Sequence, residues 1–587
     1  MFAVGLFQTG FSRESLLLHA TKQLNAGAEL ITDDWERKDL ADLNYQAAEL
    51  AARKTSFVSA VEYLQMGIHH IKGVGGWSEQ YDRTLRFHVA LARMQSSCGL
   101  LEDCWNTTEE VVRNGKDFGD LALIHRTRVL CCLQNDLLED ALQLVFDVLD
   151  TMGEPVPRKF VTMHALWGVV KARNFMRETS DEDFLKMPTV VDEHVETYQD
   201  FLQYLIEIAF LLDRTDLMLY VAMRLITLIS EKGKYPRSFL ATQFWACFFK
   251  THMGDFVDAM QYGVLSNNLA EQHKATLPGF VARSDEMYFG HVHHWLHPYR
   301  DFLEANANAF QRLWDCGFLD TAMVDAATLL HHHFMAGEPL QKIALICSNY
   351  SEAFVDYQQL THWYTNASQY QAMLNLLGRS TNPAVLAGEV IDLQTLAKLQ
   401  ENSLTPVAHY YNHFWSLVVA FQFRDLQKAK QCIKAMQGGP MADIPNLLSP
   451  LRPFYSGLTY FHLFHQTKQS KYRRRAMTFV KTLQAFVKRG AVNCIYLCQL
   501  LEAEHYAANH NLEAAVKRFD LAIHSVSELH LIHHMALAYQ LAGACLVRNG
   551  QPSTGKDYLV NAIRHYEQWG ATAIVNDLQS RYGGLLT

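Results

Sequence analysis

The sequence predicts an all-α fold, namely a TPR-like α–α superhelix in which antiparallel helix pairs stack into a solenoid. Helical periodicity runs along the whole chain, and strand-like alternation between Asn-Gly or Asp-Gly turns is nearly absent. A helix–turn–helix pattern also recurs along the chain, with small and large apolar residues at similar positions in each copy. The chain has 587 residues, of which 49% are hydrophobic, so it is long enough to bury several packed cores.

The clearest copy of the recurring pattern lies near the C-terminus. Ala503 and Ala515 are small residues twelve positions apart, and Tyr506 follows the first of them by three positions. Phe519 and Ala522 follow the second by four and seven positions. Two helices of one repeat cross closely, so small residues are expected at the crossing and large ones between neighbouring pairs. This spacing predicts a repeat that resembles a tetratricopeptide (TPR) unit.

The next copy contains the stretch GQPSTGKDY at 550–558, which superficially looks like a phosphate-binding loop. In the repeat alignment Gly543, Gly555 and Ala562 take the places of the small residues in the preceding copy. A working P-loop needs Ser or Thr after its lysine and a strand before the loop. Here Asp557 follows the lysine and the preceding residues have helical periodicity. We therefore predict a helix crossing at Gly555 and no nucleotide site.

In chain order the pattern divides the sequence into five segments. They are a leader helix (1–35), N-terminal TPR-like repeats (36–156), divergent helical repeats (157–375), helical repeats with long loops (376–453) and C-terminal TPR-like repeats (454–587). The N-terminal repeats have small residues at Ala60, Gly67, Cys104 and Ala141. Positions 60, 104 and 141 are 44 and 37 apart, longer than the TPR period of about 34 residues, so the term TPR-like is used.

Composition excludes several classes of function. The net charge of −9 argues against nucleic acid as a partner, because binding to phosphates needs clustered basic residues. The 11 cysteines lie scattered on apolar segments without a CxxC motif, which favours buried thiols in a reducing, cytoplasmic environment. The most apolar stretch, 201–230, contains five charged residues and predicts a buried helix pair, with no membrane span. The first 13 residues do not have the pattern of a signal peptide.

Several motifs resemble a known family. They are LNAGAELIT (24–32) with LNYQAA (43–48), SAVEYLQMG (59–67), LNLLGRSTNP (374–383) with GE (388–389), and LLEAE (500–504) with YEQWGA (566–571), which contains Trp569. In this order they resemble the helical-repeat region of large signalling proteins. Those proteins join a serine/threonine kinase domain, an AAA-type ATPase, this region, a GAF sensor and often a histidine kinase. The resemblance implies a protein partner, which in that family includes kinase and AAA ATPase domains.

The chain also departs from that family. It contains no kinase signature, no Walker loop and no histidine-kinase segment, so no catalytic role is carried over to any residue. It is therefore either a stand-alone relative of the repeat region or a fragment of a multi-domain kinase–ATPase enzyme whose catalytic domains lie outside this chain.

Histidines form the densest candidate cluster for chemistry. His291, His293, His294 and His297 lie close together, and the last two are three positions apart on an expected helix. A zinc site needs three or four ligands, and no Glu or Cys follows at a recognised spacing. No nucleophile elbow or HExxH motif is present. We expect hydrogen bonding between helices here, and no catalytic residue, metal ligand or cofactor; a metal-dependent helical enzyme using 291–297 is the alternative.

Three polar residues on otherwise apolar first helices are candidates for a partner groove. Counting back from the small residues of the second helices places Arg126, Glu504 and Gln540 on the concave wall of the solenoid. Ordinary solvent exposure is the alternative explanation for each of them. Taken together, the patterns favour a non-catalytic scaffold that mediates protein–protein interaction or regulates kinase or ATPase domains in signal transduction.

Overall fold

The computed structural model describes residues 13–586 apart from 55, 136, 160, 213, 252, 357–359, 401–405 and 438–445. Within these residues the regular elements are helices, and no β-strand occurs beyond an isolated bridge between Thr189 and Lys234. Consecutive helices pack as antiparallel pairs, which confirms the predicted all-α, TPR-like fold. Residues 1–12 of the expected leader helix and 438–445 of an expected loop lie outside the described part.

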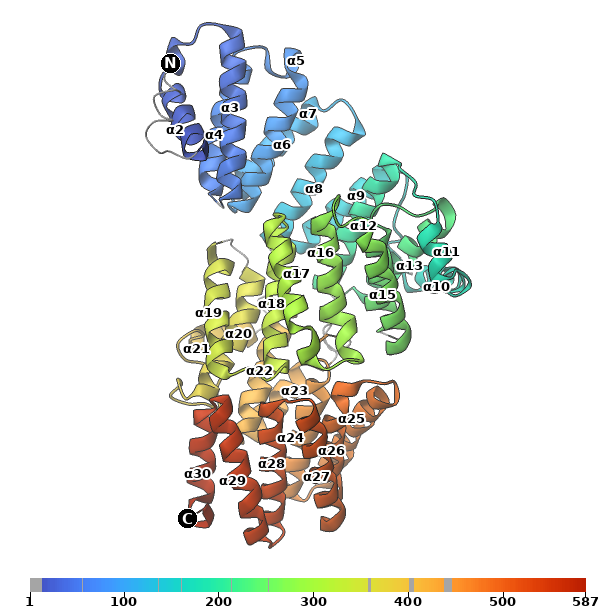
Figure 1. The fold of residues 1–587 in the computed structure, drawn as a ribbon, viewed down its shortest axis with the longest axis vertical. Helices are drawn as coiled ribbons and strands as arrows, with labels where there is room; N and C mark the ends of the chain where they lie inside the picture. The colour runs from blue at the N-terminus through green and yellow to red at the C-terminus, as the bar shows by residue number, and fades with distance from the viewer. Residues whose placement is uncertain are drawn as a thin grey trace. The chain divides into compact units, whose positions relative to one another are not determined.

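The chain forms two compact units, and the first comprises Met1–Val156, Glu193–Ile208 and Asp356–Gln359. Its described helices are α2 (Arg13–Ala26), η1 (Ala28–Leu30), α3 (Asp34–Arg53), α4 (Phe57–Lys72), α5 (Gly76–Glu79), α6 (Tyr81–Ser97), α7 (Leu101–Asn114), α8 (Phe118–Gln134), α9 (Leu138–Thr151) and most of α12 (Glu193–Leu211). The helices α3 and α4, α6 and α7, and α8 and α9 form three successive pairs (Figure 1).

Small residues let the helices of the first unit approach closely. Ala60 and Ala141 are fully buried on the second helices of their pairs. A Cβ atom added to Gly67 of α4 would lie 2.2 Å from a ring carbon of Phe87, which is itself buried on α6. The aromatic ring of Phe87 thus occupies the space that a side chain at Gly67 would need, and only glycine fits this position without movement.

The second unit comprises Pro157–Asp192, Ala209–Val355 and Leu360–Thr587. Its first described helices are α10 (Val161–Glu178), α11 (Asp181–Lys186), α13 (Thr215–Lys232), α14 (Ser238–Phe244), η2 (Trp245–Lys250), α15 (Phe256–Glu271), α16 (Pro278–Met287), η3 (Tyr288–Val292), η4 (His293–Trp295), η5 (Tyr299–Phe302), α17 (Leu303–Asp315), α18 (Leu319–Met335), α19 (Leu340–Asp356) and α20 (Leu360–Leu377). They continue with α21 (Leu393–Gln400), α22 (Pro406–Gln422), α23 (Leu426–Ala435), α24 (Leu451–Thr467), α25 (Ser470–Lys488), η7 (Val492–Cys494), α26 (Ile495–Ala508), α27 (Leu512–Glu528), α28 (Ile532–Arg548), α29 (Pro552–Trp569) and α30 (Thr572–Leu586).

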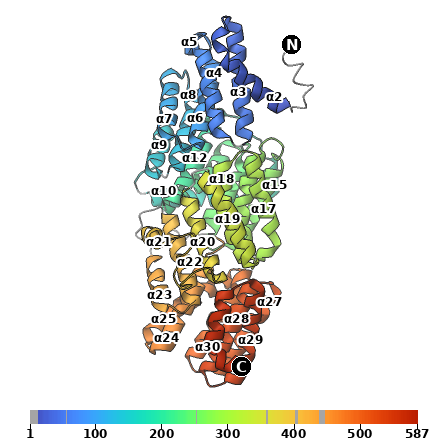
Figure 2. The ribbon, with the colours of Figure 1, turned by 90° about the vertical axis from the view of Figure 1, so that its left-hand side faces the viewer.

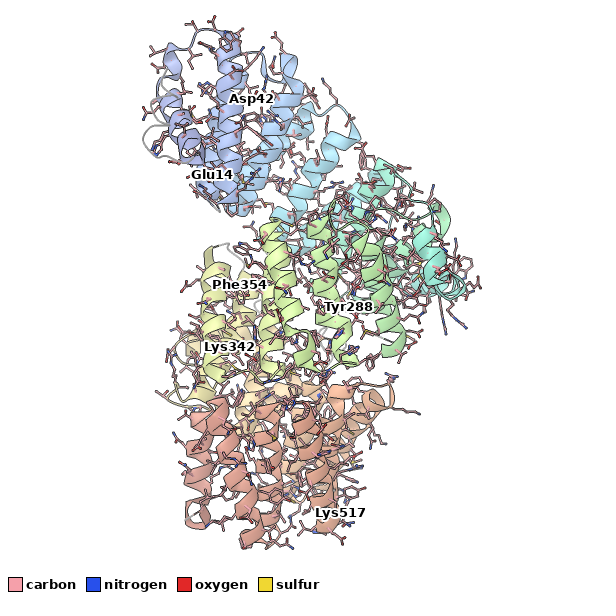
Figure 3. All side chains as sticks on the ribbon, viewed as in Figure 1. Glu14, Asp42, Tyr288, Lys342, Phe354 and Lys517 are labelled. Atoms are coloured by element: carbon pink, nitrogen blue, oxygen red, sulfur yellow. The ribbon has the colours of Figure 1, made fainter. Side chains whose placement is uncertain are left out.

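Two short π-helical segments interrupt the regular pairs in the middle of the second unit. They are η2 and η3, each of which continues an α-helix. Tyr288 opens η3 and is labelled in Figure 3. A Cβ atom added to Gly263 of α15 would lie 2.7 Å from the Tyr288 ring. The bulky ring therefore packs directly against helix backbone, and the widened turn of η3 provides a different side-chain register from a regular α-helix.

A close helix crossing joins α28 to α29, which run side by side in both ribbon views (Figures 1 and 2). A Cβ atom on Gly543 would lie 3.0 Å from the carbonyl oxygen of Gly555, and a Cβ atom on Gly555 would lie 3.0 Å from that of Gly543. The backbones therefore approach to a distance that leaves no room for side chains at these two positions. The preceding turn has Gly550 at φ 79°, and α29 begins at Pro552.

The other positions of the C-terminal repeat pattern are mostly internal. The fully buried members are Ala503, Ala515, Phe519, Ala522 and Ala562, and Trp569 is nearly so. Tyr506 differs from the expectation that it fills space between pairs, because it is 36% exposed. The buried residues of α26 include its alanines Ala503, Ala507 and Ala508 together with larger side chains such as Tyr496 and Leu500. The stretch 550–558 is a turn followed by the start of α29, and helix α28 precedes it.

None of the described helices combines the length and the apolar character that a membrane crossing requires.

We predict that Gly555→Ala lowers the free energy of unfolding by about 1–3 kcal/mol, because its methyl group would collide with α28. A helical glycine normally gains about 0.5–1 kcal/mol from this substitution, so the sign distinguishes the crossing from ordinary helix propensity. Gly584→Ala on α30 is the matched control, since a Cβ there meets nothing within 4 Å. Urea unfolding followed by circular dichroism measures both; an unchanged or higher midpoint for Gly555→Ala would contradict the close approach.

Candidate functional site

Arg126, one of the three expected groove residues, lies on α8 and forms an ion pair within the first unit. Its Nη2 atom is 2.8 Å from Oδ2 of Asp200 on α12 and 3.4 Å from the hydroxyl oxygen of Thr197. The side chain of Arg126 is only partly exposed, and Asp200 is buried. Arg126 thus joins two helices of the first unit, and its contact with a partner stays a prediction.

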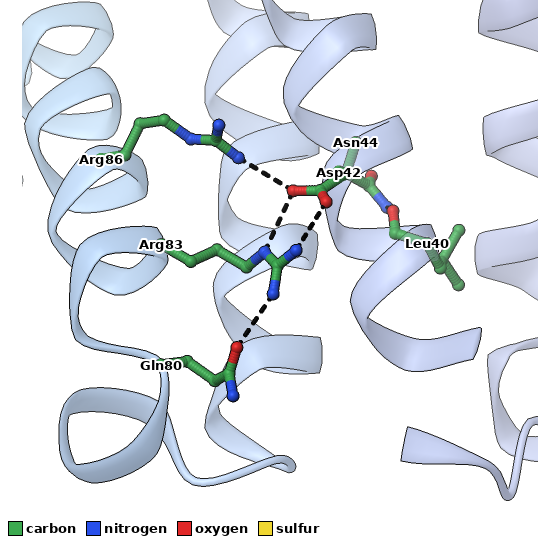
Figure 4. Close-up of polar contacts among 6 residues, drawn as sticks. All are labelled: Leu40, Asp42, Asn44, Gln80, Arg83 and Arg86. Atoms are coloured by element: carbon green, nitrogen blue, oxygen red, sulfur yellow. Dashed lines mark hydrogen bonds and ion pairs between the residues drawn. The ribbon is translucent and has the colours of Figure 1, made fainter. Parts of the chain in front are cut away.

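A similar polar contact joins the first helices of the two preceding pairs (Figure 4). Arg83 of α6 donates from Nε and Nη2 to the two carboxylate oxygens of Asp42 on α3, at 3.1 and 2.8 Å. Arg86 donates to the same carboxylate at 2.8 Å and lies 4.5 Å from the centre of the Tyr45 ring. Gln80 accepts a further bond from Arg83. A two-pronged arginine contact of this kind fixes the relative position of the two helices.

Glu504, the second expected groove residue, lies on α26 and is only 1% exposed. Its Oε2 atom is 3.1 Å from Nε2 of His465 on α24 and 3.4 Å from Nη2 of Arg548 on α28. His462 approaches the other carboxylate oxygen at 3.9 Å. Burial alone would raise the pKa of Glu504, but Arg548 and the two histidines lower that pKa to about 2. The carboxylate is therefore charged and joins three successive first helices.

Gln540, the third expected groove residue, is buried on α28 and accepts a hydrogen bond of 2.7 Å from the hydroxyl group of Tyr566 on α29. The structure thus places Glu504 and Gln540 inside the helix stack, whereas the sequence pattern predicted an exposed wall. The reason is that helices adjacent in space cover these faces. That these two residues contact a partner stays a prediction, and their burial gives it no support.

We predict that Glu504→Ala lowers the free energy of unfolding by about 3–5 kcal/mol, because Arg548 loses its buried counter-charge and His465 loses a hydrogen-bond partner. The control is Glu513→Ala on α27, whose exposed carboxylate pairs with Lys517, a residue labelled in Figure 3. Such a surface pair contributes about 0–1 kcal/mol. The midpoints of urea unfolding at neutral pH give the stability of both variants. If both substitutions lower it by the same small amount, the charge of Glu504 does not stabilise the helix stack.

The histidine cluster forms a packed aromatic region. The rings of His293 and His297 stack with centroids 4.2 Å apart, and His294 is buried. Nε2 of His332 lies 2.7 Å from the carbonyl oxygen of Tyr299. Across the part of the chain that the structure describes, no group of three or more His, Cys, Asp or Glu side chains is arranged to hold a metal ion. The geometry therefore adds no support to the metal-enzyme alternative.

Burial keeps four histidines of this region neutral, namely His293, His331, His332 and His333. It lowers the pKa of His331 and His332 to about 3, and that of His333 to about 4. Burial and the neighbouring His297 lower the pKa of His293 to about 4. In the unfolded chain each imidazole takes up a proton near pH 6.5. The stabilisation from keeping them neutral is complete above pH 6.5 and is lost as the pH falls towards about 3.

We predict a steep loss of stability between pH 7 and pH 5, to which each buried histidine contributes about 2 kcal/mol at pH 5. His331→Phe should reduce the slope, since phenylalanine keeps the ring that stacks 4.7 Å from Tyr411 but binds no proton. His530→Gln, at an exposed position, is the control. Urea midpoints across this pH range test the prediction, which fails if the slope of His331→Phe equals that of the unsubstituted chain.

An open groove follows the outer side of α28 in the second unit. Ile532, Met535 and Tyr539 are partly exposed at positions i, i+3 and i+7 of this helix, so they form one line along its surface. Two hollows adjoin this line and share Met535 and Ser527 as lining residues. The two hollows therefore form a continuous depression whose floor is apolar and aromatic.

The larger hollow has a volume of about 460 Å³ and lies between α27 and α29. Exposed carboxylates line it on both sides, at Asp520 of α27 and Asp557 of α29. The hydroxyl group of Tyr558 donates to Asp520 at 2.6 Å. Burial, and to a smaller extent this hydrogen bond, raises the pKa of Tyr558. The ring of Tyr539 stacks on His565, which fixes its orientation at the floor. This end of the groove is acidic and rich in tyrosine.

The smaller hollow has a volume of about 310 Å³ and lies at the other end of the line. Its lining includes Arg300 and His530, and Nε of Arg300 donates to the carbonyl oxygen of Ala336 at 2.9 Å. Trp569 closes one side and donates to the carbonyl oxygen of Glu338 at 2.9 Å. This end is basic, so the groove carries opposite charges at its two ends.

The sequence pattern missed this groove by one residue along α28. The count from the second-helix residues selected Gln540, whereas its neighbour Tyr539 faces the groove. One residue on a helix corresponds to a rotation of about 100°, which exchanges an inner position for an outer one. The partly exposed line 532–535–539 is visible as a helical spacing in the sequence. By contrast, Arg300 comes from a distant segment and has no signal near α28.

The fold and site define a TPR-like helical-repeat protein with an open groove. No family model matches the chain, and no curated protein matches it in sequence. Among solved structures, a chain in the crystal structure of the APC/C hetero-tetramer Cut9–Hcn1 aligns over 98% of both chains, with 11% identity and a TM-score of 0.37. A chain in the structure of Naa15/Naa10 bound to HypK-THB aligns over 100% of this chain and 93% of its own, with 10% identity and a TM-score of 0.18. Likenesses as weak as these carry no argument about function.

Proposed function

We propose that the protein is a non-catalytic scaffold that binds a segment of a partner protein in the groove along α28. The observation that supports this most directly is the combination of an apolar floor with opposite charges at its ends. The floor is formed by Met535 and Tyr539, the acidic end by Asp520 and Asp557, and the basic end includes Arg300.

The charges of the groove define the chemistry of the segment. A lysine or arginine is expected against Asp520 and Asp557, where two carboxylates face it from opposite walls. An apolar side chain is expected over Met535, and a carboxylate towards Arg300 and His530. Tyr539 supplies a large, rigid contact surface that loses little conformational freedom on binding. We therefore infer a segment with a basic residue at one end and an acidic residue or a chain terminus at the other.

We further propose that this binding serves signal transduction in the cytoplasm, with a kinase or AAA ATPase domain as the partner that is regulated. The support for this context is the resemblance of the sequence motifs to the repeat regions of multi-domain kinase and ATPase proteins. Assembly with such a domain would control its access to substrate. A transcript that continues into kinase or P-loop sequence would instead favour the fragment hypothesis, in which the regulated domain belongs to the same chain.

We predict that selection from a displayed library of random peptides enriches sequences with Lys or Arg at one end and Asp or Glu at the other. The charge reversal Asp520→Lys/Asp557→Lys should remove the preference for basic residues and replace it with one for acidic residues. The expected loss of affinity for the originally selected peptides is about 2–5 kcal/mol, since a paired charge becomes a repelled one. Fluorescence anisotropy with labelled peptides measures it.

The matched control is Asp103→Lys/Glu513→Lys, which makes the same change in net charge at exposed carboxylates outside the groove. Its peptide preference and affinities should equal those of the unsubstituted chain. The proposal fails if the library yields no enriched class, or if both double variants weaken binding equally. The second result would indicate a general effect of net charge instead of recognition in the groove.

A further inference from the structure

Helix α10 of the second unit has one face fully used in packing. Val161, Ala165, Ala172 and Met176 are buried along it, and the helix packs against α13. A Cβ atom on Gly168 would lie 2.0 Å from the sulfur of Met223 on α13. This close contact fixes the rotation of α10 about its own axis, and hence determines which residues point away from the unit.

On the opposite face, four large apolar side chains are exposed to solvent. Met163, Leu166, Trp167 and Val170 are 62, 58, 88 and 61% exposed. Their positions i, i+3, i+4 and i+7 place them on one continuous stripe of the helix surface. Single exposed apolar residues are common, but a contiguous stripe with an almost fully exposed tryptophan marks a contact surface.

Basic residues surround this apolar stripe. Lys159 lies two residues before the start of α10, and Arg173 and Arg177 lie one and two turns after Val170; all three are exposed. Lys171 at the flank pairs with Glu231 at 2.7 Å. Glu178, at the end of α10, is its one acidic residue. The patch is therefore locally positive on a chain whose net charge is −9.

The charges discriminate between the surfaces that could cover the stripe. If two copies of this chain packed stripe against stripe, Lys159 or Arg177 of one copy would meet a basic residue of the other in either direction, which is unfavourable. An anionic lipid surface attracts all of these residues at once. Tryptophan, aliphatic residues and flanking Lys or Arg on one helix face are typical of helices that lie in the interface of a bilayer.

The acidic segment that follows α10 weakens this attraction only in part. Asp181, Glu182 and Asp183 begin α11. Asp183 bonds to the hydroxyl group of Ser180 at the helix cap, and Glu182 pairs with Lys186 at 3.2 Å. The pair with Lys186 offsets one of these three negative charges, while Lys159, Arg173 and Arg177 remain beside the stripe.

We propose that α10 attaches the protein to an anionic membrane surface, with Trp167 and its apolar neighbours inserted at the level of the lipid headgroups. The attachment is peripheral, because one face of α10 remains packed on α13. It uses a surface different from the groove along α28, so membrane binding and peptide binding are separable properties of the second unit.

Co-sedimentation with unilamellar vesicles tests this proposal. The purified full chain should bind vesicles of phosphatidylcholine with about 30% phosphatidylserine, and bind phosphatidylcholine alone at least about tenfold more weakly. About 0.5 M salt should release it, since screening shortens the range of the attraction. Trp167→Ser and the double reversal Arg173→Glu/Arg177→Glu should each lower the partition coefficient at least about tenfold.

Two matched variants separate the patch from general effects. Trp35→Ser removes an exposed tryptophan elsewhere, on α3, and Arg474→Glu/Arg475→Glu makes the same charge change on the exposed side of α25. Both should bind like the unsubstituted chain, and all four variants replace exposed residues, so their melting curves should coincide. Absence of vesicle binding, equal binding to both lipid compositions, or binding that Trp167→Ser leaves unchanged would overturn the proposal. A protein partner for the stripe would then be the remaining explanation.

Discussion

The contact of two glycine backbones where α28 crosses α29 is the constraint on which the groove depends. Each glycine, Gly543 and Gly555, occupies the position where a side chain would meet the carbonyl oxygen of the other. A contact this close leaves α28 no freedom to rotate. The rotation in turn determines that Met535 and Tyr539 face outward while Gln540 faces Tyr566. The groove, and the function proposed for it, therefore depend on glycine at positions 543 and 555, where a side chain would not fit.

A second feature is the use of polar side chains to join first helices to one another. In the first unit Asp42 and Arg126 have this role, and in the second unit Glu504 joins α24, α26 and α28. Buried and partly buried ion pairs of this kind add little net stability compared with apolar packing. They do penalise any arrangement that separates the partners. We infer that in this protein they select the relative position of neighbouring repeats, and that partner recognition uses other residues.

The fold could be predicted from the sequence because its causes are local. Helical periodicity and small residues such as Ala515 and Gly555 act within one helix pair, and spacing alone shows them. The exposure of individual residues has distant causes. Glu504 is buried by His465 and Arg548, which are 39 and 44 positions away. The basic end of the groove comes from Arg300, and the stripe around Trp167 has the spacing of an ordinary buried helix face. Neither could be inferred before the helices were placed.

Site-specific photo-cross-linking with a bound peptide tests most directly whether recognition uses the outer side of α28. Benzoylphenylalanine would be placed at Met535 in one variant and at Arg126 in another, each with the same library-selected peptide. We predict an efficient cross-link from position 535 and only background from position 126. A cross-link from position 126 with none from position 535 would show that the peptide binds where the polar side chains join first helices, and would contradict recognition along α28.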